Sequence, residues 1–136
     1  MDEPRQKVVA RYADTRVLKG YATDFHPESL DFHLRPATPE APSPVRVQVG
    51  DLKAVFFVRD FAGDPRYNER KHFDGAVLPV GRKVEVTFHD GELLVGSTTT
   101  GYAPDRTGFF FTPADPRSNN LRVFAVCDAV KAIRYL

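Results

Sequence analysis

The chain has 136 residues, with 19 lysines and arginines against 18 aspartates and glutamates, so its formal net charge is +1. This balance excludes a field strong enough to attract nucleic acid or an anionic membrane non-specifically. The length suits one domain, or two very small domains that share a core. No apolar run approaches the roughly 20 residues that span a bilayer, so we expect a cytoplasmic protein with no membrane partner.

Eleven prolines, nine glycines and eleven phenylalanines, with no tryptophan, describe a turn-rich chain with bulky side chains that favour strands. An all-β fold without long helices is therefore expected. Two segments, "KVVARYADTRVLKGYATDF" from Lys7 and "KVEVTFHDGELLVGSTTTGY" from Lys83, share one pattern at a shift of 76 positions. Beyond them the shift grows to 77 and 78, and the matched pairs include Val8 with Val84, Gly20 with Gly96, Phe32 with Phe109, Val45 with Val123 and Lys53 with Lys131.

Matches that continue across loops of different length indicate an internal duplication. We predict two tandem small β-barrel units of about five strands each, packed together, with residues 1–60 as the first unit and residues 82–136 as the second. Gly20 and Gly96 would lie inside their strands, where a recurring glycine favours a sharply bent sheet.

The strands of the first unit begin with the alternating residues from Val8 to Tyr12, followed by a hairpin arm in "VLKGYATDF" and a third strand near "LDFHL". The fourth, "VRVQV", alternates strictly, with Val45, Val47 and Val49 on one face. The fifth, "AVFFV", does not alternate, and neither does "GFFF" in the second unit. Strands of this kind are buried on both faces, so the two units should cover each other, or a second chain should cover them.

The segment from residue 61 to residue 81 connects the two units and has no sustained periodicity, although "RYNERKHF" has the length of two helical turns. In the second unit, the hairpin turn contains Asp90 and Gly91, and glycine accepts the positive φ that such turns need. Further along lies "DPRSNN", which is rich in turn formers that hydrogen-bond their own backbone. Asp115, Asn119 and Asn120 of this run are also candidates for a partner-binding surface.

Three phrases, "VLKGYATDFHPESLDFHL", "DLKAVFFVRDF" and "GFFFTPADPRSNNLRVFAV", cover well over half of the chain and resemble a family of small, largely uncharacterised bacterial proteins built as tandem β-barrel modules. The units are also similar in strand pattern to Sm-like barrels and, in the second half, to PilZ domains. The PilZ resemblance implies a cyclic dinucleotide held by an RxxxR pair, here Arg66 and Arg70. Two guanidinium groups so spaced can fork onto phosphate oxygens.

The second PilZ motif, D/N-x-S-x-x-G, is missing. The corresponding region, "YAPDRTGFFF", supplies Arg106 as a third ligand-binding candidate but has neither the serine nor the spacing. The Sm-like resemblance implies RNA, but the loops "DFHPESL" and "VQVGDL" lack the asparagine and the arginine-glycine pair of Sm proteins. Together with the near-neutral charge, this argues against nucleic acid.

No spacing typical of a metal site connects the four histidines, and no nucleophile elbow or phosphate-cradling loop occurs. The sequence therefore predicts no catalytic residue, no metal and no cofactor. We expect a non-enzymatic binding or regulatory adaptor that acts through protein-protein contacts. The open alternatives are a PilZ-type receptor, an Sm-like RNA binder, and a homodimer in place of a foreign partner.

Overall fold

The chain folds almost entirely into strands. A computed structural model describes residues 6–38, 43–63, 66–67, 69–73, 81–103 and 105–136. In the first half the strands are β1 (Gln6–Tyr12), β2 (Val17–Ala22), β3 (Asp31–Pro36), β4 (Val45–Gln48) and β5 (Leu52–Val58), with the 3-10 helix η1 (Val49–Asp51) between the last two. In the second half they are β6 (Arg82–Phe88), β7 (Leu93–Thr98), β8 (Gly108–Pro113), β9 (Asn120–Val126) and β10 (Val130–Tyr135), with η2 (Cys127–Ala129) before β10.

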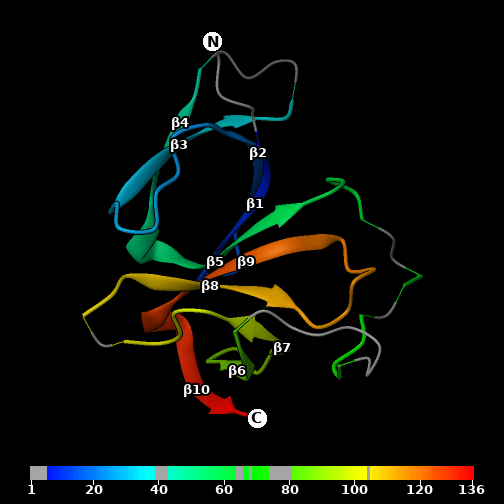
Figure 1. Ribbon diagram of the computed structural model, residues 1–136. Helices are drawn as coiled ribbons and strands as arrows, with labels where there is room; N and C mark the ends of the chain where they lie inside the picture. The colour runs from blue at the N-terminus through cyan, green and yellow to red at the C-terminus, as the bar shows by residue number, and fades with distance from the viewer. Residues whose placement is uncertain (1–5, 39–42, 64–65, 68, 74–80, 104) are drawn as a thin grey trace.

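One open sheet contains all ten of these strands, in the order β10-β6-β7-β8-β9-β5-β1-β2-β3-β4, and every pair is antiparallel. In Figure 1, β5, β8 and β9 cross the middle of the molecule, with β1 to β4 above them and β6, β7 and β10 below. The all-β prediction is confirmed. The finer expectation of two separate barrels is not confirmed, because hydrogen bonds between β5 and β9 join the halves into one sheet.

The two halves repeat the same strand order and the same register. Val8 lies opposite Gly20 in the first half, and Val84 lies opposite Gly96 in the second. The first strand of each half also pairs with the last strand of that half, and each of these pairs contains one register shift at the equivalent place. Chance similarity between strand-rich segments would not reproduce both features, so the register supports the predicted duplication.

The two predicted strand glycines lie where another strand comes too close for a side chain. A Cβ on Gly20 would overlap the carbonyl oxygen of Arg35 in β3, and a Cβ on Gly96 would overlap that of Thr112 in β8. The neighbouring strands can therefore approach this closely at both equivalent positions only because no side chain is present.

The strand β5 is buried along its whole length, and this explains its lack of alternation. Ala54, Phe56 and Val58 belong to a cluster formed mainly by the second half, whereas Val55 and Phe57 belong to a cluster formed mainly by the first half. Each buried phenylalanine or valine contributes about 1.5–3 kcal/mol relative to an exposed one. The prediction that "AVFFV" is covered on both faces is confirmed, and both covers come from the chain itself.

The strand β4 follows its predicted alternation only in part. Val47 and Val49 are buried, but Val45 is 39% exposed. Val45 begins the strand that forms one edge of the sheet, so no neighbouring strand covers it from outside.

The connection between the halves runs from Arg59 to Gly81. The described residues of "RYNERKHF" adopt turns and irregular backbone with no helix, so the two helical turns are not found there. Residues 64–65, 68 and 74–80 of this connection lie outside the described part of the chain. None of the helices in the described residues is long and apolar enough to cross a membrane.

Candidate functional site

An open groove with a volume of about 710 Å³ lies where the two halves meet. Its floor is apolar and consists of Val9 from β1, Phe56 and Val58 from β5, and Leu94 from β7. Each of these four side chains is at most 6% exposed, so they offer only their outer atoms to the groove. The floor of the groove is therefore the outer surface of the hydrophobic core.

Charged side chains surround this floor. The basic side chains that line the groove are Arg11, Lys19, Arg59, Lys71 and Arg117, and the acidic ones are Asp60, Glu69 and Glu92. Several of them already bond to the chain: Lys19 donates to the carbonyl oxygen of Phe61 at 2.8 Å, for example. The groove therefore combines a largely buried apolar floor with a mixed, mostly basic rim.

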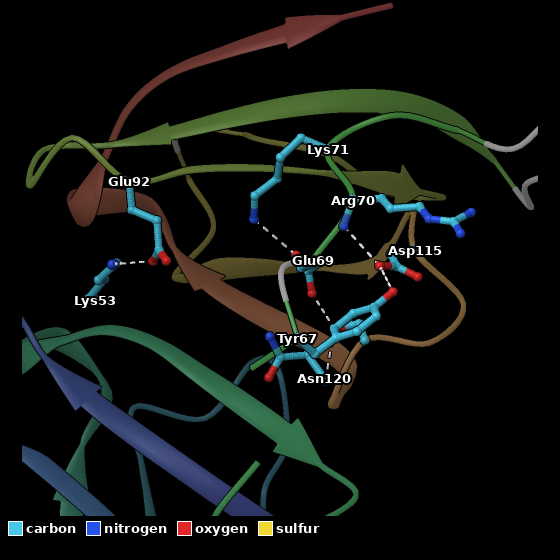
Figure 2. Close-up of polar contacts among 9 residues, drawn as sticks. Lys53, Tyr67, Glu69, Arg70, Lys71, Glu92, Asp115 and Asn120 are labelled. Carbon is cyan, nitrogen blue, oxygen red and sulfur yellow. Dashed lines mark hydrogen bonds and ion pairs between the residues drawn. The ribbon is translucent and has the colours of Figure 1, made fainter. Parts of the chain in front are cut away.

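The segment after β5 forms one wall of the groove, and the turn between β8 and β9 holds it in place. We call the described residues 66–67 and 69–73 the strap. The carboxylate of Asp115 accepts hydrogen bonds from the hydroxyl of Tyr67 and, at 2.8 Å, from the backbone N–H of Arg70 (Figure 2). It also accepts the backbone N–H of Arg117 at 2.9 Å, within its own turn. Asp115 is thus both a turn former and an anchor for the strap.

A second contact fixes the strap beside the first. Ser118 donates its hydroxyl hydrogen to Glu69, whose other oxygen pairs with Lys71 at 3.1 Å. The Ser118 hydroxyl also accepts the backbone N–H of Asn120 at 3.0 Å. Ser118 is 2% exposed, so its partners replace water that it cannot reach.

The end of β5 is tied to the same turn. Asn119 accepts the backbone N–H of Asp60 at 3.1 Å and donates its side-chain amide to the Asp60 carbonyl at 2.8 Å. The guanidinium of Arg59 donates to the Ser118 carbonyl at 3.2 Å. One turn in the second half therefore positions both the chain leaving the first half and the strap.

The electrostatics of Asp115 follow from this geometry. Burial raises the pKa of its carboxyl, but hydrogen bonds from the Arg70 N–H, the Tyr67 hydroxyl and the Arg117 N–H outweigh burial, and the net pKa is lowered. The same bond to Asp115, with a smaller effect of burial, raises the pKa of Tyr67. The pair is therefore a neutral phenol donating to a carboxylate at neutral pH.

At the other end of the groove, Lys53 joins the halves. Its Nζ lies 2.6 Å from Asp90 and 2.5 Å from Glu92, both in the β6–β7 turn, and 4.9 Å from the centre of the Phe88 ring. Lys53 is 9% exposed, and its bond to Glu92 fixes one acidic side chain of the groove rim (Figure 2).

The predicted ligand-binding arginines lie apart from the groove. Arg66 and Arg70 are exposed and belong to the lining of neither described cavity, and Figure 2 shows the Arg70 guanidinium pointing away from Glu69 and Lys71. Arg106 lines a second cavity of about 530 Å³, together with Asp51, Asp105 and Asp128. The described geometry shows no shared site for the three arginines.

The predicted partner-surface residues lie at the strap contact. Asp115 is 2% exposed, and Asn119 and Asn120 are half-buried and line the groove. Asp115 therefore lies behind the surface, while the two asparagines reach it. Their role toward a partner stays a prediction.

Sequence reasoning missed several residues that build the site. Tyr67 and Glu69, between Arg66 and Arg70, line the groove, and so does Lys71, directly after Arg70. The one signal in the sequence is that these three residues recur at every second position, and the expectation of a connecting loop with a possible short helix did not use it. Within the described residues no group of three or more histidine, cysteine, aspartate or glutamate side chains is placed to hold a metal ion.

Comparison with known proteins gives a family and no further match. Neither the curated proteins nor the solved structures contain a match to this chain. One family model matches residues 4–136, which is nearly the whole chain, and it describes a family of unknown function. The chain therefore belongs to that family, DUF6982.

Proposed function

We propose that this chain is a non-enzymatic binding module that acts as an adaptor or regulator, with the groove between its halves as the surface that contacts a partner protein. The observation that carries the proposal is the groove itself, an apolar floor inside a charged rim. Protein interfaces combine an apolar centre with a polar border in this way.

The acidic side chains of the groove support a binding role over a catalytic one. Glu69 is bonded to Ser118 and Lys71, and Glu92 is bonded to Lys53. Asp60 accepts the backbone N–H of Ala62 at 3.2 Å. These carboxylates are bonded to side chains and backbone groups of the chain itself, which favours a positioning role, whereas a general acid or base needs a substrate within hydrogen-bond reach.

The rim also indicates what kind of partner fits. Five basic side chains against three acidic ones favour a partner segment with acidic side chains beside an apolar one. Arg11 lies over the Phe56 ring of the floor, 5.8 Å from its centre, so one charged side chain reaches the apolar centre directly.

We also propose that each half is a small, strongly curled unit of the barrel type that arose by duplication. The support is the shared strand order, the shared register and the matching glycines Gly20 and Gly96. No described contact favours the PilZ-type or Sm-like alternatives.

The test uses affinity capture from source cells, followed by titration with the purified partner. The groove variant combines Arg11→Glu with Lys71→Glu, two rim positions. The control combines Arg16→Glu with Arg35→Glu, which makes the same charge change at exposed positions outside the groove lining.

We expect the groove variant to bind the partner at least about ten-fold more weakly, equivalent to about 1.4 kcal/mol, and the control to bind like the unchanged chain. Equal binding by all three proteins would place the partner surface elsewhere and refute the proposal.

A further inference from the structure

The two ends of the sheet are strands with one neighbour each. In the described residues, β4 pairs only with β3, and β10 pairs only with β6. Figure 1 shows β4 near the top of the molecule and β10 near the bottom. An edge strand presents unpaired N–H and C=O groups that can bind a further strand.

These edges are the repeat equivalents of the two strands that pair inside the molecule. The pair Phe32 and Val47 of β3–β4 corresponds to Phe109 and Ala125 of β8–β9, so β4 is the counterpart of β9. The pair Val8 and Phe57 of β1–β5 corresponds to Val84 and Tyr135 of β6–β10, so β10 is the counterpart of β5. The two edge strands β10 and β4 are thus the counterparts of β5 and β9, which pair with each other inside the chain.

We propose that β4 of one copy of this chain pairs with β10 of a second copy, in the register of the internal β5–β9 pair. Inside the chain, Ala54 lies opposite Ala125 and Phe56 lies opposite Val123. Both strands have counterparts 78 positions away, so the register between copies places Ala132 opposite Val47 and Arg134 opposite Val45. This inference is independent of the groove and goes beyond the proposed adaptor function.

The side chains at the two edges are compatible with pairing between copies. Val45 on β4 is 39% exposed, and Tyr135 and Leu136 at the end of β10 are 38% and 56% exposed, so each edge offers apolar surface to the other. The two arginines beside them are paired within their own chain, because Arg46 pairs with Asp31 at 2.5 Å and Arg134 pairs with Glu85 at 3.0 Å. The two edges can therefore approach each other without repulsion between unpaired arginines.

The same residues set the strength and the geometry of the contact. β4 has four residues and follows Pro44, which has no N–H to donate, so the ladder between copies is short. A short ladder predicts weak association, which becomes detectable only as the protein concentration rises. Because the two edges differ, the contact joins copies head to tail and does not form a two-fold dimer.

The experiment is a disulfide test of register, in full-length chains that carry Cys127→Ser. One chain carries Val45→Cys and the other, distinguished by a mass tag, carries Arg134→Cys. Opposed cross-strand residues have Cβ atoms about 4.5–5.5 Å apart, close enough for a disulfide after a small adjustment. The matched control replaces Val45→Cys with Val17→Cys, which is similarly exposed at 44% but lies on the interior strand β2.

We expect the Val45→Cys and Arg134→Cys mixture to form at least about ten-fold more mixed disulfide than the control mixture, because pairing raises the effective concentration of the two thiols. We also expect neither variant alone to form its own dimer above the control level. Mixed disulfide at the control level would overturn the proposal. Dimers of Val45→Cys alone, formed as readily as the mixed species, would overturn it too, since they would mean like-to-like pairing.

Discussion

Asp115 connects a local turn to a distant segment with one carboxylate. One oxygen accepts the N–H of Arg117, two residues away, and the other accepts groups of Tyr67 and Arg70 in the strap. The local half of this arrangement was predictable, because aspartate commonly hydrogen-bonds the backbone two residues on. The distant half was not, since no pattern in "DPRSNN" encodes which segment will lie against it.

The first prediction concerns removal of this carboxylate. Asp115→Ala leaves the Tyr67 hydroxyl and the N–H groups of Arg70 and Arg117 without their acceptor, so we expect a loss of about 1–3 kcal/mol in the free energy of unfolding. Urea denaturation measures it. Asp14→Ala is the control, because the exposed Asp14–Arg16 pair contributes little. A change no larger than that of the control would show that the strap contact does not stabilise the fold.

The pH dependence of the same variant has a definite sign. The pKa of Asp115 lies below its ordinary value of 3.8 in the folded chain, so its contribution is fully present above pH 3.8 and is lost as the pH falls through the folded pKa. The difference in unfolding free energy between the unchanged chain and Asp115→Ala should therefore be constant near neutral pH and narrow below pH 3.8. A difference that widens in acid would contradict the assigned bonding.

At the scale of elements, the repeat predicted equivalent strands but not equivalent environments. Lys53 in β5 and Lys131 in β10 are matched residues of the repeat. Lys53 is 9% exposed and paired with the β6–β7 turn, while Lys131 is exposed on an edge. The difference arises because the β6–β7 turn and Phe88 of the second half lie against Lys53, and a repeat alone does not say which of its copies lies inside.

The strand glycines give a prediction at the same scale. Gly20→Ala and Gly96→Ala should each destabilise the chain by about 1–3 kcal/mol, because the added Cβ meets the backbone of the neighbouring strand and the strands must separate. Gly50→Ala is the matched control, since nothing lies within 4 Å of its added Cβ and its φ is not positive. Thermal or urea unfolding measures all three. Losses that differ greatly between Gly20→Ala and Gly96→Ala would argue against equivalent environments at the two positions.

At the scale of the molecule, the non-alternating strands were the most informative part of the sequence. "AVFFV" predicted cover on both faces, and the two clusters that contain alternate residues of β5 provide it. The pattern did not reveal that β5 also pairs directly with β9, because pairing between distant strands depends on the whole topology. The groove was equally beyond the sequence, since β1, β5, β7, the strap and the β8–β9 turn form it together.

The two halves share one sheet through β5 and β9, so we expect them to unfold together. Native-state hydrogen exchange, followed residue by residue, tests it most directly. We expect the slowest amides in β5 and β9, with opening free energies equal to that of global unfolding, faster exchange in the edge strands β4 and β10, and one unfolding transition for both halves. Two separate transitions, or β5 amides that exchange as fast as those of β4, would contradict the claim.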